Sequence, residues 1–247
     1  MGPVSVVIIA SNAEPTIDAT LRSLRPFPEV LLYLNDSTDG TRGIAAGYPN
    51  VTVADGPFAG FGPTRNLAAD RARHDWVLSL DSDETIPPAL AAEIGALALD
   101  DANAVYVLKR DNYLLGKRVR HGGWGGDRVV RLYNRTRHRF NDALVHERVE
   151  PRAGAPVTLL GHSFRHDAVR DLDQLLHKVI RYSDLAAADK TTRSFLVVLA
   201  AAHFAFFRSY VLQLGFLEGW RGVVIAVSDF NGRFFRYTKR YLNCGRK

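Results

Sequence analysis

Three carboxylates stand close together after an apolar run in the first third of the chain. The apolar run at 76–80 (WVLSL) is followed by Asp81, Asp83 and Glu84. Such a run is typical of a buried strand in a parallel sheet, and open α/β folds bind ligands at the carboxyl ends of these strands. Carboxylate oxygens suit Mg²⁺ or Mn²⁺, which also take substrate phosphates as ligands. The alternative is an acidic helix start, because the same carboxylates precede Pro87 and a helical stretch.

A second polar cluster, NDSTDGT at 35–41, follows an apolar run at 29–34. Small residues and glycine at a strand-to-helix turn leave backbone N–H groups available and can cap the next helix. A plain capped turn explains this segment when it is taken alone. If the two strands are parallel, however, both clusters lie at one edge of the sheet. Their convergence favours a nucleotide-binding site.

Apolar runs and helical spacings alternate along the first half of the chain. Strands are predicted at 4–10, 29–34, 51–54, 76–80, 104–109 and 129–133, and helices at 16–24, 41–46, 66–73 and 89–99. From about residue 167 the pattern is helical. This alternation predicts an α/β fold, with a mainly parallel sheet flanked by helices and a helical C-terminal region.

Composition places the chain among globular proteins. Of its 247 residues, 47% are hydrophobic and 23% are charged. The one cysteine, Cys244, rules out an internal disulfide and fits a reducing compartment. The first residues carry no basic segment followed by a cleavable apolar stretch, so no signal peptide is evident. We therefore expect a cytoplasmic protein.

Positive charge is concentrated at the C-terminal end. From residue 190 onward, ten basic residues face two acidic ones, so this part carries +8 and the rest −2. It is also the most apolar part, which favours an anionic membrane surface; a helical lobe with a solvated basic face is the alternative. The apolar run at 195–207 covers 13 residues, fewer than the roughly 20 of a spanning helix, and predicts a core or interfacial helix. Aromatic residues among basic ones also occur in single-strand binders, but no nucleic-acid fold signature accompanies them, so we expect no nucleic-acid partner.

A set of motifs in fixed order resembles family-2 glycosyltransferases. The matching segments, in order, are STDGT at 37–41, RN at 65–66, WVLSLDSDE at 76–84, GGW at 122–124, RLY at 131–133 and VHE at 145–147. The last three resemble the branch related to lipopolysaccharide core glucosyltransferases. The likeness runs from about residue 4 to 166 and continues more loosely beyond it.

The resemblance implies a GT-A fold, with a nucleotide-sugar-binding and catalytic domain at 1–166 and a helical region at 167–247. It also implies a nucleotide-diphosphate sugar donor, with a UDP-sugar as the leading candidate, and Mg²⁺ or Mn²⁺ as cofactor. By this likeness Asp83 binds the metal, and Asp81 approaches the ribose or the metal. A cation of this kind neutralises the charge that develops on the departing diphosphate.

The nucleotide pocket implied by the resemblance departs from the family pattern at one position. Arg65 would lie near the base or diphosphate, and Asn12 and Glu14 would line the pocket after the first strand. Related enzymes commonly carry an aspartate where this chain has Leu34, and here the acidic group is displaced to Asp36. The identity of the base is therefore open. Asp39, in the matching turn, has two readings, a nucleotide contact and a helix cap.

Inverting transfer needs one base that takes the proton of the acceptor hydroxyl. The candidates are Glu147, which the later-strand location favours, then Asp127 and Asp142. His146 adjoins Glu147 and is a candidate for acceptor binding.

Two further side chains have open roles. His166 matches a late histidine that ligates metal in several GT-A enzymes, with a packing histidine as the alternative. Trp124 either stacks on a sugar of the acceptor or donor or anchors its loop to the core.

The function expected from the sequence is transfer of one sugar, with inversion, to a glycolipid at the cytoplasmic face of the inner membrane. The expected acceptor is the lipopolysaccharide or lipooligosaccharide core. Three alternatives remain: an exopolysaccharide or other lipid-linked acceptor, an inactive membrane-bound scaffold of the same fold, and a nucleotidyltransferase. The last would normally need a Gly-rich, basic loop after the first strand, and SNAEP at 11–15 is not one.

Overall fold

The chain forms two compact units. The computed structural model describes residues 2–142, 147–185 and 194–244. The first unit comprises residues 1–110 and 128–166, and the second comprises 111–127 and 167–247. The segment 111–127, which a single boundary at 166 assigns to the first domain, therefore groups with the C-terminal helices.

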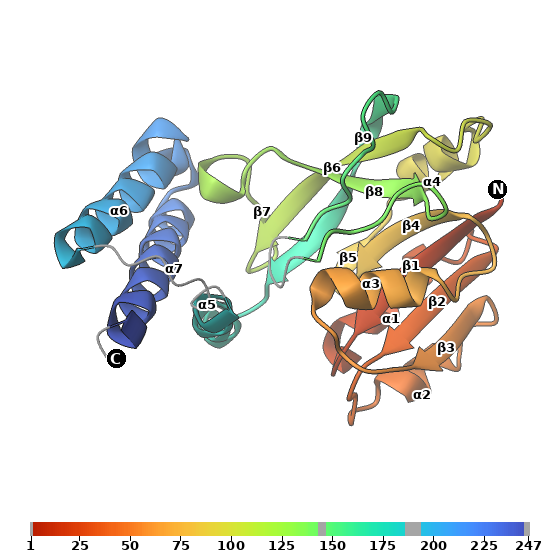
Figure 1. The fold of residues 1–247 in the computed structure, drawn as a ribbon, viewed down its shortest axis with the longest axis horizontal. Coiled ribbons are helices and arrows are strands. Elements are labelled where there is room, and N and C mark those ends of the chain that lie inside the picture. Colours follow the sequence, from red (N-terminus) through yellow and green to blue (C-terminus); the bar gives the residue numbers. More distant parts are fainter. Residues whose placement is uncertain (1, 143–146, 186–193, 245–247) are drawn as a thin grey trace. The chain divides into compact units, whose positions relative to one another are not determined.

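Four parallel strands form the first half of the sheet, in the order β3-β2-β1-β4 (Figure 1). Their bounds are β1 Val4–Ala10, β2 Glu29–Leu34, β3 Val51–Asp55 and β4 Trp76–Asp81. Every residue of β1 and β2 is buried, as expected for near-continuous apolar runs in a sheet covered on both faces. The predicted α/β architecture is confirmed, and these four strands lie within one or two residues of their predicted bounds.

Helices pack on both faces of these strands. Their bounds are α1 Glu14–Ser23, α2 Thr41–Ala45, α3 Phe61–Ala69 and α4 Pro88–Gly95. Alternate side chains of β1 point to opposite faces: Val6 and Ile8 pack in the core with α1 and α4, and Val7 and Ile9 pack in the core with α3.

The prediction of a helix at 66–73 was wrong in its bounds. Helix α3 begins at Phe61, directly after Gly60, whose φ of 99° is one that glycine adopts without strain. Pro63 lies in the first turn, where its missing N–H would have no partner in the helix. The Gly-Pro pair in this segment therefore lies inside the start of the helix.

Later strands add antiparallel pairs to the sheet. These strands are β5 Glu84–Thr85, β6 Val105–Leu114, β7 Lys117–Arg118, β8 Asp127–Asn134 and β9 Val157–Val169. Strand β8 pairs antiparallel with β4, β5 with β9, and β7 with β6. Strand β9 was not predicted, because its second half, GHSFRHD at 161–167, is polar and lacks a clear apolar alternation.

The second unit is mostly helical and has its own core. Its elements are η1 Gly122–Trp124, α5 Leu172–Leu185, α6 Phe195–Phe207, η3 Arg208–Leu212, η4 Gly215–Glu218 and α7 Trp220–Cys244. Leu114, Val119, Leu175 and Ile225 form the buried cluster, with Trp124 packed against it. The long helices α6 and α7 lie side by side (Figure 1).

Helix α6 is longer than its apolar run predicts, because Arg208 does not end it. The helix continues through the π-helical turn η3, giving 18 helical residues at Phe195–Leu212. In the part of the chain that the structure describes, this is the one helix with the length and composition to cross a membrane. Only 17% of these residues are buried.

Candidate active site

Asp81 is the last residue of β4 and is held by two arginines. One of its carboxylate oxygens pairs with Arg65, and the other accepts a hydrogen bond of 2.9 Å from Arg131. Burial by itself would raise the pKa of this carboxyl, but the two guanidinium groups outweigh it and hold the pKa well below its ordinary value. Asp81 is therefore a fixed anion at the edge of the sheet.

Glu84 lies beneath this edge with its side chain fully buried. One of its carboxylate oxygens accepts the backbone N–H of Asp81 at 2.9 Å, and the other pairs with Arg131 at 2.7 Å. Arg110 approaches the second oxygen at 3.6 Å. Burial raises the pKa of Glu84, and Asp81 adds to this effect, while Arg131 opposes it. Glu84 thus anchors both the chain turn after β4 and the arginine that holds Asp81.

Strand pairing explains why Arg131 reaches these carboxylates. Strand β8 runs antiparallel to β4, with Leu132 opposite Leu78. Arg131 is therefore next to the carboxyl end of β4, and its side chain is only 6% exposed. From the sequence, this arginine is part of the RLY segment that resembles the family, and no role is predicted for it. The strand pairing supplies one.

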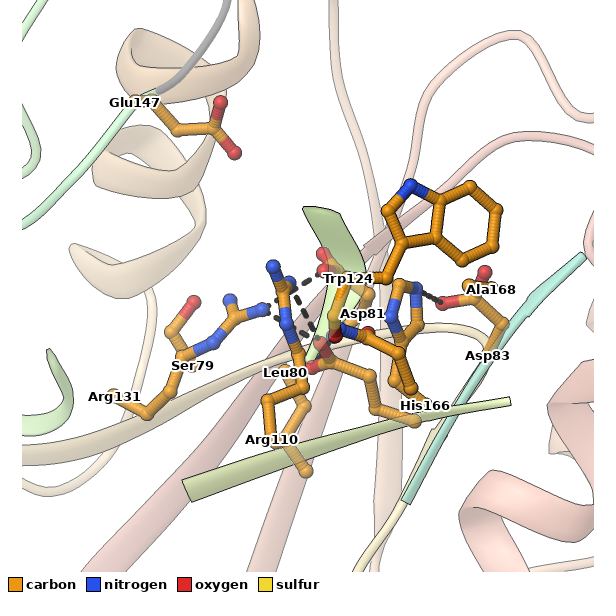
Figure 2. Close-up of polar contacts among 12 residues, drawn as sticks. Ser79, Leu80, Asp81, Asp83, Arg110, Trp124, Arg131, Glu147, His166 and Ala168 are labelled. Atoms are coloured by element: carbon orange, nitrogen blue, oxygen red, sulfur yellow. Dashed lines mark hydrogen bonds and ion pairs between the residues drawn. The ribbon is translucent and has the colours of Figure 1, made fainter. Parts of the chain in front are cut away.

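Arg65 on α3 connects the two sides of the site. Its guanidinium pairs with Asp81, donates to Ser79 Oγ at 3.0 Å and to Glu147 Oε1 at 3.2 Å, and lies over the ring of Phe140. The side chain is 4% exposed. Arg65 therefore fixes two carboxylates with different expected roles. Figure 2 shows Asp81 in the middle of the drawn cluster and Glu147 apart from it at the upper left.

Close packing holds α3 against the segment that carries Glu147. A Cβ added at Gly62 would lie 1.9 Å from the backbone oxygen of Asn141 and 3.5 Å from the Cβ of Glu147. Asn66 on the same helix exchanges two hydrogen bonds with the backbone of Phe140, at 2.9 and 3.0 Å. The position of Glu147 thus depends on α3.

Asp83 and His166 form a second pair beside this network. Strand β9 runs antiparallel to β5 with His166 opposite Glu84, and the imidazole Nε2 lies 3.6 Å from Asp83 Oδ1 (Figure 2). Both side chains are partly accessible, at 15% and 19% exposure.

This pair fits a divalent cation. Two ligands of one such cation, each about 2 Å from it, lie roughly 3 to 4 Å apart. The carboxylate suits Mg²⁺ or Mn²⁺, whereas the imidazole is a ligand more typical of transition metals. In the described residues no three His, Cys, Asp or Glu side chains gather to form a complete metal site. Substrate phosphates and water would have to supply the other ligands of a cation held by this pair.

The predicted nucleotide residues near β1 hold the turn after β2. Asn12 Oδ1 accepts the backbone N–H of Thr38 at 2.9 Å, and Glu14 Oε2 accepts that of Gly40 at 2.8 Å. Asp39 accepts the backbone N–H of Glu14 and both the N–H and the hydroxyl of Thr41. The hydroxyl of Thr41 is the main cause that lowers the pKa of Asp39. These contacts make Asp39 part of the hydrogen bonding that fixes the turn before α2, whose N-cap residue is Gly40, and its role toward the nucleotide stays a prediction.

Asp36 is exposed, at a positive φ of 51°, in the same turn. The buried Leu34 precedes it on β2, so the acidic group lies beyond the strand end, as the sequence predicts. The turn therefore presents Asp36 to solvent at the same edge as Asp81, because β2, β1 and β4 are parallel neighbours.

The remaining predicted residues are Asp127, Trp124, Asp142 and His146. Asp127 and Trp124 belong to the second unit, where Trp124 packs against the core and its carbonyl accepts a hydrogen bond from Asn112 at 2.8 Å. Asp142 is exposed. His146 lies outside the described residues. The roles suggested for these residues stay predictions.

Comparison with known proteins identifies the family of this chain. A sequence profile described as glycosyl transferase family 2 matches residues 5–161, which is more than half of the chain. The chain belongs to that family. Relatives of similar length include an uncharacterised glycosyltransferase of Rickettsia typhi, 25% identical over 97% of this chain and 87% of its own length. Another, from Rickettsia prowazekii, is 24% identical with the same coverage.

The fold is of the GT-A type. The crystal structure of S. aureus TarS superposes with a TM-score of 0.50 and 19% identity, over 92% of this chain and 48% of TarS. This chain thus spans about half the length of TarS, and the likeness concerns the fold alone. The matched family region contains Asp81, Asp83, Arg65 and Glu147.

Proposed function

We propose that this family-2 glycosyltransferase moves a sugar, with inversion, from a nucleotide-diphosphate sugar to a glycolipid acceptor. The acceptor we propose is the lipopolysaccharide or lipooligosaccharide core at the cytoplasmic face of the inner membrane. One observation carries the proposal: Arg65 joins Asp81 to Glu147 at the sheet edge that also bears the Asp83–His166 pair. A transferase needs a site for the donor's diphosphate and a base that takes the acceptor's proton. At this edge Asp83 is available to hold the metal that binds the diphosphate, and Glu147 is available as the base.

Glu147 is the proposed base. The acceptor hydroxyl oxygen attacks the anomeric carbon as the bond to the diphosphate oxygen breaks, and the hydroxyl proton passes to the Glu147 carboxylate. Arg65 holds this carboxylate at 3.2 Å, and the side chain remains 17% exposed. The carboxylate is thus oriented and still accessible to a substrate.

Asp83 and His166 are the proposed metal ligands. When bound there, Mg²⁺ or Mn²⁺ would stabilise the negative charge on the departing diphosphate. Asp81 has both oxygens engaged by arginines. We therefore propose that Asp81 faces the ribose and that Arg65 and Arg131 supply positive charge near the diphosphate. Asn12, Glu14, Asp36 and Asp39 shape the turn on the nucleotide side of the same edge.

The glycolipid acceptor rests on two features outside the catalytic cluster. One is the resemblance of GGW, RLY and VHE to lipopolysaccharide core enzymes. The other is the basic and apolar C-terminal part, with its net charge of +8, which suits an anionic membrane surface. Both support an acceptor held in a bilayer.

Nucleotide-dependent thermal stabilisation tests the donor and the metal. The protein is melted with UDP, GDP, CMP or dTDP, each with and without Mn²⁺, because a ligand that binds the folded state raises Tm. We expect one nucleotide to raise Tm only with Mn²⁺. Asp83→Ala should lose this shift, and Asp100→Ala, which removes an exposed carboxylate on a loop, should keep it.

Turnover with the matching nucleotide sugar completes this test. Glu147→Gln should keep the nucleotide shift and lose sugar transfer by a factor of about 10² or more. Nucleotide binding without any transfer by the unaltered protein would favour an inactive scaffold. Unchanged turnover in Asp83→Ala would disprove the metal role of Asp83.

A further inference from the structure

The outer side of α6 is an exposed apolar stripe. Leu196 is 77% exposed, Phe204 59%, Phe207 48% and Val211 41%. Their spacing of eight, three and four residues places them along one side of a helix. Helix α6 carries no charged residue from Phe195 to Phe207. The stripe therefore runs the length of the helix without a charged residue, and His203 is an exposed polar side chain along it.

The turn after α6 extends this apolar surface. Leu212 is 58% exposed, Phe216 46%, Leu217 57% and Trp220 53%. Contiguous exposed apolar patches of this kind mark sites that bind a protein or a membrane. We call the stripe on α6 and this turn together the apolar hairpin surface.

Helix α7 covers only the other side of α6. Val198 and Ala202 on α6 are fully buried, and Phe195 packs against Phe234 and Tyr241 near the end of α7. Because the start of α6 meets the end of α7, the two helices are antiparallel. The apolar turn lies at one end of this hairpin, and the C-terminal half of α7 lies at the other.

Basic residues are crowded in that C-terminal half of α7. Arg233, Arg236, Lys239 and Arg240 occur within eight residues, and no acidic residue lies among them. Burial, with the neighbouring charges of Arg233 and Arg240, lowers the pKa of Arg236. Lys239 pairs with Asp184 on α5, and further anions beside this segment would lessen the repulsion that Arg233 and Arg240 exert on Arg236.

This charge decides between two occupants of the apolar hairpin surface. A second copy would bring together two segments that each carry +8, which is unfavourable. An anionic lipid surface offers apolar chains to the stripe and phosphates to the basic residues. A membrane is therefore the better match.

The hairpin also favours lying in the membrane surface over crossing it. A crossing of α6 paired with α7 would take Arg233, Arg236 and Lys239 into hydrocarbon, where such charges are strongly disfavoured. Lying in the interface buries the apolar side and leaves the cations among the headgroups. Arg221 lies 4.4 Å from the Trp220 ring, so its charge remains near the same boundary.

We propose that the apolar hairpin surface docks into the headgroup boundary of an anionic bilayer, with the basic half of α7 against lipid phosphates. The proposal rests on the proposed function, in which the acceptor is a glycolipid, and it assigns the surface that brings the enzyme to that acceptor. Trp220 and Leu217 enter the boundary region, where Trp is favoured.

Vesicle co-sedimentation of the full-length protein tests this docking. Vesicles of phosphatidylcholine alone are compared with vesicles that also contain phosphatidylglycerol, at low and high salt. We expect binding to the anionic vesicles that weakens with salt. Leu217→Glu should weaken it by at least about tenfold, because an apolar contact is lost and a negative charge is added. Val157→Glu on β9 is the matched control, since Val157 is 58% exposed and Leu217 57%.

Lipid-attached quenchers give a second readout. Brominated acyl chains should quench Trp220 in the bound protein, and Trp220→Phe should lose that quenching while the protein still binds. Leu212→Glu serves as a second variant if Leu217→Glu lowers Tm.

Four outcomes would overturn the proposal. The first is no binding to either vesicle type, and the second is equal binding by Leu217→Glu and Val157→Glu. The third is that Leu217→Glu abolishes self-association of a protein that does not bind vesicles. The fourth is retention of the bound protein after alkaline carbonate extraction, as expected of a spanning helix. Nucleotide-dependent stabilisation is measured on the same samples. Vesicle binding without nucleotide binding would refute the proposed function alone, and the reverse would refute the docking alone.

Discussion

At the scale of single residues, the site is a buried network of alternating charges. Arg65 and Arg131 each contact two carboxylates, and Asp81 is shared by both arginines. Taking charges out of water is unfavourable, and removing one partner leaves the other uncompensated. Such a network fixes the positions of its side chains, but substitution of any one of them destabilises the others. Substitution of Arg65 should disturb the network most, because its guanidinium contacts both Asp81 and Glu147.

Asp81→Asn tests this network through its dependence on pH. The folded pKa of Asp81 lies below its unfolded value of about 3.9, so its ionic contribution to stability is complete above that value and is lost as pH falls through the folded pKa. Near pH 6 the variant should lose up to about 3 kcal/mol, because the buried Arg65 and Arg131 lose a charged partner that is itself partly exposed. Urea unfolding at several pH values measures the difference. It should shrink toward pH 3, and a constant difference would contradict the assigned ionic role.

At the scale of elements, one helix positions both halves of the site. Helix α3 supplies Arg65 and packs closely on the segment that carries Glu147, with Gly62 at the closest approach. The antiparallel strands contribute in the same way, since β8 brings Arg131 and β9 brings His166 to the end of the parallel half. The first four strands thus provide the edge, and the later elements provide its partners.

Gly62→Ala should disturb this packing. Its Cβ would lie 1.9 Å from a backbone oxygen that no side-chain rotation can move. We expect a loss of about 1 to 3 kcal/mol in the free energy of unfolding, with slower sugar transfer because Glu147 is displaced. Gly43→Ala on α2 is the control, because nothing lies within 4 Å of its Cβ. That change should stabilise the helix by about 0.5 to 1 kcal/mol. Equal stability and activity in the two variants would refute the positioning role of α3.

At the scale of the whole molecule, the two units have separate cores. The buried clusters on the two faces of the first sheet half lie wholly within the first unit, and the cluster of Leu114, Leu175 and Ile225 lies wholly within the second. A unit with its own core can fold by itself in principle. The expected division of labour follows: nucleotide binding in the first unit and membrane binding in the second.

A chain truncated after Val169 tests this division. It should keep the metal-dependent nucleotide shift and lose vesicle binding. Its Tm should fall, because Leu114 and Val119 lose their partners Leu175 and Ile225. Differential scanning fluorimetry and co-sedimentation measure both effects. If the truncated chain shows no cooperative melting, the first unit depends on the second for folding.

The sequence by itself determined the parallel half of the sheet and the carboxylates at its edge. Apolar runs set β1, β2 and β4, and the polar residues after them follow directly along the chain. It did not determine the start of α3 or the existence of β9, because a Gly-Pro start and a polar strand lack the usual local patterns. Nor did it give Glu84 and Arg131 their roles.

Only the tertiary structure decided which partners these carboxylates have. Arg65 and Glu147 are 82 residues apart, and Arg131 and Glu84 are 47 apart. Local patterns reflect neighbours within a few residues, as periodicity and turn chemistry do. Contacts across such distances depend on strand register and helix packing, which many residues fix together. The sequence therefore determined which groups can do the chemistry, and the fold determined which of them meet.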